Sequence, residues 1–157
     1  MAKLELQELT EMIVGDLMIE SEKVAHVQLN NPLEHALLVL VKSGYSVIPV
    51  LDHTYRLQGM ISKTAILNEV LGMERFEMEK LSELKVLDTM LTDVPVLKKS
   101  DPFLTALKAV VNHAFLCVLD EEGYFEGILT RRAILKQMNR YLHEQVHFHP
   151  AGDKTNA

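Results

Sequence analysis

The chain has 157 residues, of which 48% are hydrophobic and 24% charged, and this composition is typical of one compact globular domain. Its longest uninterrupted apolar runs, at 36–41 and 114–119, are far shorter than the ~18 residues of a membrane span. The net charge of −6 provides no overall attraction for DNA or anionic lipid, so a bound anion would need a local basic cluster. A single cysteine and an N-terminus without a signal-peptide core predict a cytoplasmic protein.

The first predicted element is an amphipathic helix at the N-terminus. Leu4, Leu6, Leu9 and Ile13 are interleaved with acidic residues, which gives such a helix one apolar and one charged face. A helix of this kind either covers the core of its own chain or pairs with another chain, and the pattern leaves both interpretations open.

Two stretches of the chain, roughly 16–67 and 88–135, repeat one another. In each copy the apolar pattern predicts a β-α-β-β-α unit, so the fold class is α/β with two tandem repeats related by a pseudo-twofold axis. The matching segments are Asn31-Pro32-Leu33 with Asp101-Pro102-Phe103, Val50-Leu51-Asp52 with Val118-Leu119-Asp120, and Ala65-Ile66-Leu67 with Ala133-Ile134-Leu135.

The repeat sets the expected domain organisation. Between the copies, apolar residues lie among charges without any proline, and this pattern predicts a mostly helical connector. We expect the last residues, 150–157, to be disordered. The predicted boundaries are 1–14 for the N-terminal helix, 15–70 for the first domain, 71–86 for the connector, 87–142 for the second domain and 143–157 for the C-terminal tail.

Local signals predict where the helix in the middle of each copy begins and ends. Asn31 before Pro32 predicts an N-cap followed by proline at the first helical position, and Glu34 supplies the acid of a capping box. Asp101 repeats the cap in the second copy, and Gly44 is placed to end the first helix.

The strands and final helices have signals of their own. Val47–Leu51 is wholly apolar, which predicts a strand buried on both faces, and Lys23–Val27 is the predicted initial strand of the first copy. Ser62 and Thr130 predict the N-caps of the final helix in each copy.

The most informative chemistry lies in Thr130-Arg131-Arg132, at the predicted start of the last helix. The positive end of a helix dipole disfavours cations, so two arginines there indicate a bound anion whose phosphate oxygens they neutralise. The alternative is a surface pair of arginines that bridges to acids such as Glu121 or Glu126.

Packing of the two copies on each other predicts a groove suited to a nucleotide. Tyr45 offers an aromatic face for a base, and the backbone of the initial strand offers hydrogen bonds to a base edge. The candidate ligand-binding residues are Lys23, Val24, Ala25, His26, Val27, Tyr45, Ser46, Ile48, Thr130, Arg131 and Arg132.

A second groove, related to the first by the repeat, would use Val94-Pro95-Val96, 114–117 and Ser62-Lys63-Thr64. Pro95 removes a backbone donor there, and a single lysine replaces the arginine pair. We expect this groove to be the weaker or vacant one.

The helix starts carry a family resemblance. Two units that each end in Gly-hydrophobic-hydrophobic-Ser/Thr, with Asn/Asp-Pro before the first helix, resemble a tandem pair of cystathionine-β-synthase (CBS) domains, also called a Bateman module. The motifs are Gly59-Met60-Ile61-Ser62 and Gly127-Ile128-Leu129-Thr130, and the likeness covers about residues 13–140. Many adenosine-nucleotide-binding members carry Asp three residues after the Ser/Thr. This chain has Ala65 and Ala133 there, which counts against an ordinary AMP or ATP site.

The stand-alone length, the N-terminal helix and Thr130-Arg131-Arg132 are similar to the small CBS proteins of Firmicutes that bind cyclic di-AMP. This likeness implies a homodimeric, non-enzymatic second-messenger receptor without a cofactor, and no nucleic-acid or membrane partner. Its ligand state would control contact with a target enzyme such as a Rel-type (p)ppGpp synthetase or pyruvate carboxylase. An AMP- or ATP-binding energy sensor is the alternative function, and a scaffold for dimerisation alone is another.

A third class of function, metal-dependent hydrolysis, is suggested by His143-Glu144-Gln145-Val146-His147, which spells the H-E-x-x-H zinc motif. A zinc protease needs a third ligand from another element, and His149 is too near in sequence to be one. We therefore interpret the two histidines as exposed side chains of a C-terminal helix, and expect no metal site and no catalytic residue. Cys117 lies in an apolar strand without a neighbouring cation, which favours a core side chain over a nucleophile.

Overall fold

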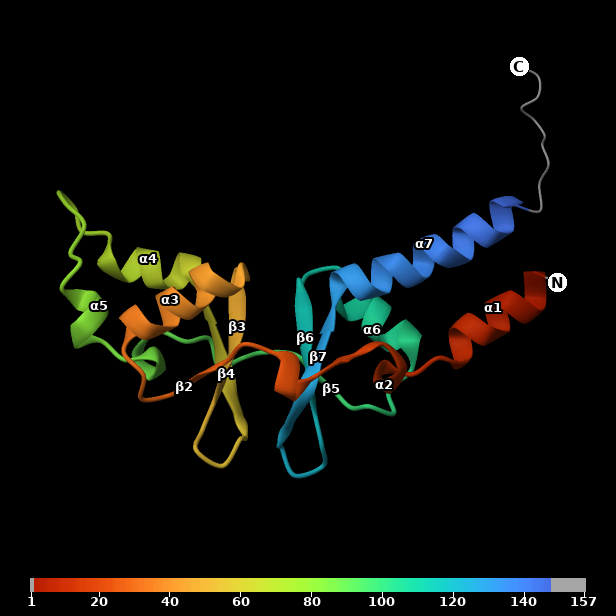
Figure 1. Ribbon diagram of the computed structural model, residues 1–157, viewed down its shortest axis with the longest axis horizontal. Coiled ribbons are helices and arrows are strands. Elements are labelled where there is room, and N and C mark those ends of the chain that lie inside the picture. Colours follow the sequence, from red (N-terminus) through yellow and green to blue (C-terminus); the bar gives the residue numbers. More distant parts are fainter. Residues whose placement is uncertain (1, 148–157) are drawn as a thin grey trace, which may run out of the picture.

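The computed structural model describes the backbone of residues 2–147 and the side chains of residues 7–144. Two halves lie side by side along the long axis of the molecule (Figure 1). The first half contains β2 (Val27–Gln28), α3 (Leu33–Ser43), β3 (Val47–Leu51), β4 (Leu57–Ser62) and α4 (Lys63–Val70). The second contains β5 (Val96–Leu97), α6 (Phe103–Ala109), β6 (Phe115–Leu119), β7 (Phe125–Thr130) and α7 (Arg131–His147). The predicted α/β fold with two β-α-β-β-α repeats is confirmed.

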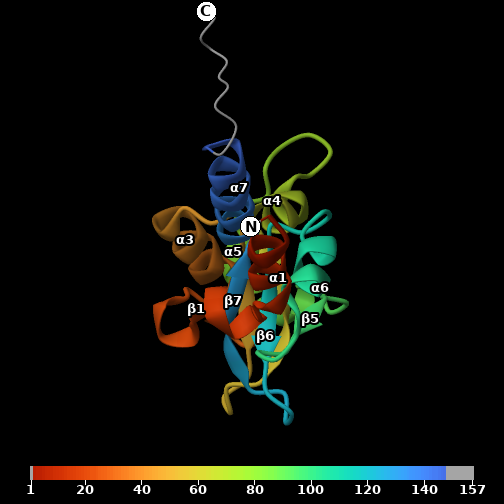
Figure 2. The same cartoon turned by 90° about the vertical axis from the view of Figure 1, so that its right-hand side faces the viewer.

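Each half has a sheet in which a parallel pair is followed by an antiparallel hairpin. In the first half the order is β2-β3-β4, and in the second β5-β6-β7 is extended by β1 (Ile19–Glu20) at its far edge. Viewed end-on, α3 and α6 lie on opposite sides of the strands (Figure 2). The hairpin tips project away from α4 and α7 (Figure 1).

The two halves exchange short segments of backbone. β1, near the start of the first repeat, pairs with β7 of the second repeat, and Leu91, near the start of the second repeat, pairs with Met60 of β4. Both hydrogen bonds between Leu91 and Met60 measure 2.8 Å. Because each half completes the sheet of the other, neither repeat is a self-contained unit.

Apolar side chains fill a shared core between the two sheets, in addition to one core within each half. The shared core joins strands β3 and β4 to strands β6 and β7, so it fixes the two hairpins against each other. Its buried members are Val24, Leu51, Met60, Phe115, Cys117, Phe125 and Ile128.

The tips of the hairpins are also joined. The Phe125 N–H donates to the Tyr55 carbonyl at 2.9 Å, and the guanidinium of Arg56 lies 4.4 Å from the centre of the Tyr124 ring. The two halves are therefore tied at the tips as well as through the shared core.

The N-terminal helix α1 (Ala2–Glu11) packs against α6 and α7. Leu9 is buried there in the core of the second half, and after α2 (Val14–Leu17) the chain reaches β1. This burial favours the core-covering interpretation of the helix for Leu9, whereas the side chains of Leu4 and Leu6 lie outside the described residues, as do residues 148–157.

Several predicted helix ends are confirmed. Gly44 ends α3 with φ 81°, a left-handed conformation that glycine adopts without a steric cost. The hydroxyls of Ser62 and Thr130 each accept a hydrogen bond from the N–H three residues later, at 3.0 Å.

The predicted caps of α3 and α6 are wrong. The helices begin at Leu33 and Phe103, with prolines in the cap positions. Asn31 instead accepts from the N–H of Gln28 at 2.8 Å, and Asp101 from the N–H of Lys98, also at 2.8 Å. These side chains close the turn before each proline, an alternative use that Asn and Asp make of the same short polar group.

The predicted initial strand and the predicted helical connector are also wrong. Ser21–Lys23 forms the 3-10 turn η1 and only Val27 of the predicted strand lies in β2, because Val24 turns into the shared core. After α4 the chain turns at Gly72, whose N–H donates to the Arg75 carbonyl at 2.9 Å. The connector therefore holds only two short helices, α5 (Lys80–Glu83) and η2 (Val86–Asp88). No helix in the described part of the chain combines the length and apolarity that crossing a membrane requires.

The exchange of β1 predicts a measurable difference between two glycines with positive φ. A Cβ at Gly127 would collide with the Ile19 carbonyl oxygen of β1, whereas a Cβ at Gly123 would meet no atom within 4 Å. Gly127→Ala should lower the free energy of unfolding by about 3 kcal/mol through overpacking, and Gly123→Ala by about 1 kcal/mol through backbone strain alone. Equilibrium urea unfolding followed by circular dichroism measures both values. Equal losses would contradict the close approach at Gly127.

Candidate ligand-binding cleft

A cleft of about 420 Å³ opens where the two halves meet. The loop between α3 and β3 forms one wall, the residues before β6 face it, and the β7–α7 junction and β1 complete it. The lining residues are Ile19, Gly44, Tyr45, Ser46, Val47, Ala114, Phe115, Thr130 and Arg132.

The start of α7 supplies the polar side of this cleft. Thr130 caps the helix by accepting the Ala133 N–H at 3.0 Å, and its own O–H remains available to donate to a ligand. The Arg131 N–H donates to the Ala114 carbonyl at 2.8 Å, which ties the two walls together. The positive end of the helix dipole adds to the attraction for an anion.

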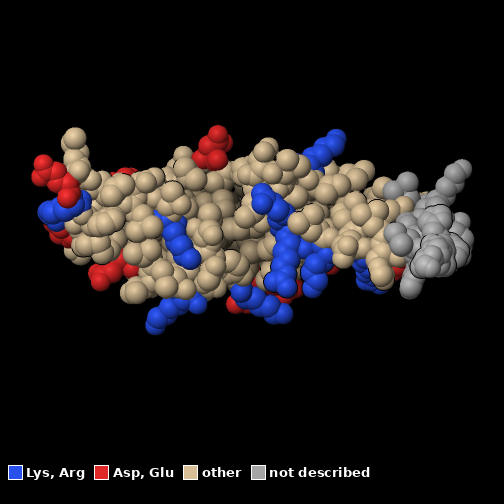
Figure 3. All heavy atoms as spheres, turned by 90° about the horizontal axis from the view of Figure 1, so that it is seen from above, with Lys and Arg blue, Asp and Glu red and all other residues tan. Residues whose placement is uncertain are grey.

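Arg132 is the cation of the cleft. Its side chain is exposed, and no described residue forms an ion pair or a hydrogen bond with its guanidinium. Seen from the side of α4 and α7, Lys and Arg side chains gather over the beginning of α7, beside the hollow between the halves (Figure 3). An unpaired guanidinium at a helix N-terminus is poised to bind phosphate oxygens in bidentate fashion.

Arg131 lies differently, although it is adjacent in sequence. Its Nε donates to the Val110 carbonyl at 2.9 Å, and the residue lines a neighbouring apolar hollow along α7. The alternative interpretation of the arginine pair is not what the structure shows, because Glu121 pairs with Lys98 at 2.7 Å and Glu126 with Lys99 at 2.9 Å.

The structure thus brings four of the candidate residues to the cleft, namely Tyr45, Ser46, Thr130 and Arg132. The others lie elsewhere: Val24 in the shared core, Ala25 against the first core, Lys23 in η1, Val27 in β2, Ile48 buried in β3, and Arg131 as described above. His26 places its Nδ1 3.3 Å from the Val24 carbonyl and its ring edge-on to Tyr55, with centroids 5.4 Å apart.

Sequence reasoning missed other residues of the wall. Ala114 and Phe115 are the repeat counterparts of Ser46 and Val47, so the repeat itself is the signal that places them beside the cleft as well as in the second groove. Ile19 reaches the cleft through the pairing of β1 with β7, for which no local sequence signal exists.

The second groove is present and smaller, at about 210 Å³. Asp93 and His113 are its titratable residues, and neither lysine nor arginine lines it. Val94, Pro95, Ala114 and Phe115 line it as predicted, whereas the predicted Ser62, Lys63 and Thr64 do not. Without any cation in its lining, it is the less favourable site for a phosphate. Its lining residues are Val47, Met60, Leu91, Asp93, Val94, Pro95, Asn112, His113, Ala114 and Phe115.

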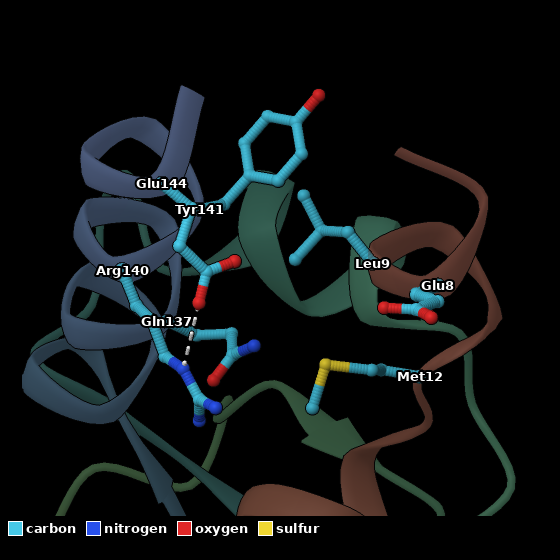
Figure 4. A pocket seen from close by; sticks show the side chains of 7 residues that line it. All are labelled: Glu8, Leu9, Met12, Gln137, Arg140, Tyr141 and Glu144. Carbon is cyan, nitrogen blue, oxygen red and sulfur yellow. Dashed lines mark ion pairs between the residues drawn. The ribbon is translucent and has the colours of Figure 1, made fainter. Parts of the chain in front are cut away.

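A further hollow of about 350 Å³ lies between α1 and α7 and contains part of the H-E-x-x-H motif (Figure 4). Glu144, the motif's acid, pairs with Arg140 at 3.5 Å, and the side chain of His147 lies outside the described residues. Among the described side chains no group of three or more His, Cys, Asp or Glu residues is placed to hold a metal.

Cys117 is enclosed in β6, where burial raises the pKa of its thiol to about 12. A thiol with such a pKa stays protonated at neutral pH, and the thiolate is the nucleophilic form. The position fits a core side chain.

Comparison with known proteins finds the same two repeats. The CBS-domain model matches residues 14–72 and 82–140. The chain is 50% identical over 142 residues to a Bacillus subtilis protein named cyclic di-AMP receptor B, covering 90% of this chain and 97% of that protein. A CBS domain-containing protein of unknown function from Bacillus anthracis is 59% identical, with a TM-score of 0.82 over 86% of this chain and 98% of that one. The CbpB protein of Listeria monocytogenes, solved in complex with c-di-AMP, is 55% identical, with a TM-score of 0.79 over 84% and 98%.

Proposed function

The chain belongs to the CBS-domain family, and we propose that it is a non-enzymatic receptor that binds cyclic di-AMP in the cleft between its two repeats. The observation that carries this proposal is the guanidinium of Arg132 at the N-terminus of α7, which has no partner among the described residues and lies in a cleft that both halves line. The likeness to the cyclic di-AMP receptor B of Bacillus subtilis and to the c-di-AMP complex of Listeria CbpB supports the choice of ligand.

The chemistry of the cleft suits a cyclic dinucleotide. Such a ligand carries two phosphate charges and two adenine bases, and it has no free 3′-hydroxyl on either ribose. Arg132 and the Thr130 hydroxyl offer the phosphate contacts, while Tyr45 and Phe115 offer aromatic faces for a base. Ala133, in the first turn of α7, provides no carboxylate to clamp ribose hydroxyls, which favours the cyclic dinucleotide over AMP or ATP.

Binding would act through a shift of population. A ligand held by residues of both halves stabilises the conformation in which those walls face each other, and a partner that prefers the other conformation is released. The family resemblance suggests that the partner is a cytoplasmic target enzyme, such as a Rel-type (p)ppGpp synthetase or pyruvate carboxylase. The function proposed for the chain is therefore second-messenger signalling.

We also propose that the receptor is a homodimer. Large apolar side chains are exposed on four helices, including Leu38 of α3, Leu67 of α4, Leu104 of α6 and Leu135 of α7, and a second copy would cover them. Leu135→Glu should then weaken self-association by about tenfold or more, because it buries a charge at the interface. Sedimentation velocity measures the change, with Leu87→Glu in η2 as the control for an exposed leucine outside these helices. A dimer that survives Leu135→Glu unchanged would place the interface elsewhere.

Arg132→Met tests the phosphate contact directly. The substitution should weaken cyclic di-AMP binding by about 1.5–3 kcal/mol, the range for charge-assisted hydrogen bonds, while the melting temperature of the free protein stays the same. Lys136→Met, one turn further along α7 and outside the cleft, is the matched control. Isothermal titration calorimetry gives the affinities. If Arg132→Met binds as tightly as the wild type, the phosphate is held by other residues.

A panel of nucleotides separates the proposed ligand from the energy-sensor alternative. At equal concentration, cyclic di-AMP should raise the melting temperature more than AMP or ATP, because stabilisation follows affinity by mass action. Ala133→Asp should increase the response to AMP by restoring a carboxylate near the ribose. A larger shift with AMP or ATP than with cyclic di-AMP in the wild type would favour the energy sensor, and no shift with any nucleotide would favour a scaffold.

A further inference from the structure

The connector between the repeats contains a loop, residues 71–79, that breaks the pseudo-twofold symmetry of the molecule. In the second repeat the corresponding helix, α7, continues to His147, whereas α4 ends at Val70 and the chain turns out into this connector loop. The loop lies at the end of the molecule opposite to the N-terminus (Figure 1).

Large apolar side chains are concentrated on the connector loop. Met73 is fully exposed, at 103%, Phe76 is 60% exposed, and Leu71 and Met78 are more than half exposed. Exposed apolar residues that occur singly are ordinary, but a contiguous group on a short loop is a feature of interaction sites. Methionine and phenylalanine are also side chains that interfaces favour.

The loop is held in shape by its own backbone and charges. Hydrogen bonds join the Gly72 N–H to the Arg75 carbonyl and the Glu77 N–H to the Val70 carbonyl, and Leu71 forms a β-bridge with Phe76. A preformed loop loses less conformational entropy when a partner binds than a flexible one does.

Two ion pairs reinforce this shape. Arg75 pairs with Glu79 at 2.6 Å and Lys80 with Glu77 at 2.8 Å, and the hydrogen bond from Arg75 lowers the pKa of Glu79. Arg75 of the loop and Lys80, the first residue of α5, are therefore both already engaged. Glu74 is exposed and forms no ion pair with any described residue, so the charge left unpaired within the loop is acidic, and we take the border of the apolar group to be acidic.

The acidic border identifies the kind of partner. An isologous contact of this loop with the same loop of a second copy would bring two acidic borders together, and like charges at close range are destabilising. A protein surface with an apolar pocket bordered by lysine and arginine fits both the apolar side chains and their border. Electrostatic complementarity of this kind favours encounter with the right partner.

The loop is also connected to the cleft. The first N–H of α4, from Lys63, donates to the carbonyl of Ser46 at 3.0 Å, and Ser46 lines the cleft. The opposite end of α4 leads into the connector loop at Leu71. If a ligand displaces the loop that contains Ser46, this hydrogen bond would move α4 with it. The far end of α4 leads into the connector loop, so the exposed apolar group would move as well.

We propose that residues 71–79 are the docking site for a protein partner with a basic border around an apolar pocket, and that this partner is the target enzyme of the receptor. The inference rests on the proposed function for the existence of a target, and it goes beyond that function in assigning the target to a surface separate from the cleft.

Binding of purified enzymes by substituted full-length chains tests the proposal. The probes are the Rel-type (p)ppGpp synthetase and the pyruvate carboxylase of the same organism, measured by biolayer interferometry without nucleotide. The double variant Met73→Ser/Phe76→Ser should weaken binding of the target by about tenfold or more, as loss of a central apolar contact does. Glu74→Lys should weaken it by about threefold or more by repelling a basic border.

Controls separate docking from folding and from ligand binding. Val111→Ser and Glu122→Lys alter an exposed valine and an exposed glutamate elsewhere, and they should leave target binding unchanged. The connector-loop variants should keep the melting temperature, the oligomeric state and the cyclic di-AMP affinity of the wild type.

Each contrary result has a distinct meaning. Target binding that is unaffected by the connector-loop variants would overturn the docking site and leave the proposed function intact. A loss of self-association in these variants would show that a second copy occupies the loop, which also overturns the proposal. If the wild type binds cyclic di-AMP but neither enzyme, the docking proposal fails together with the proposed targets, while nucleotide recognition stands.

Discussion

The apolar contact between the two sheets is the constraint on which the rest of the structure depends. Burial of a large apolar side chain such as Leu51 or Phe125 contributes about 1.5–3 kcal/mol, whereas a single hydrogen bond between the hairpin tips contributes about 1 kcal/mol. The shared core therefore outweighs the tip contacts in setting how the halves meet. Because β3 and β6 are fixed against each other, the loops that precede them face one another, and the cleft forms between them.

The same backbone arrangement produces two grooves with different chemistry. The starts of α4 and α7 are equivalent by the repeat, and Ser62 and Thr130 cap them in the same way. The two grooves differ in the charged side chains that line them. The guanidinium of Arg132, in the first turn of α7, lines the larger cleft, whereas no cation lines the smaller one. A duplicated fold can thus acquire one anion site by changing the first turn of a single helix, with little cost to the core it shares with its counterpart.

Sequence reasoning succeeded where a structural preference is local. Gly44 and Thr130 sit at helix ends whose geometry their own side chains determine, and the repeat revealed the order of elements. It failed where contacts with residues distant in sequence determine the structure. Residues 19–20 form a strand, β1, because they pair with the edge of β7, and Val24 lies outside the predicted strand because its side chain is buried in the shared core. Among the candidate site residues, the sequence could not separate Arg132 from its neighbour, because only the phase of the helix against α6 decides which guanidinium meets the Val110 carbonyl.

The ties between the halves also limit how a bound ligand acts on the protein. Opening the cleft by swinging the halves apart would expose the shared core and break the exchanged segments, and both costs far exceed a typical coupling free energy of about 1–3 kcal/mol. Movements of the cleft walls alone cost less free energy, because they leave the shared core and the exchanged segments in place. Ser46 and Ala114 each accept a hydrogen bond from the first N–H of a helix, α4 and α7 respectively. Under the proposed function, ligand occupancy would be transmitted most readily as a small displacement of these two helices, and a partner would detect it at the surfaces at their far ends.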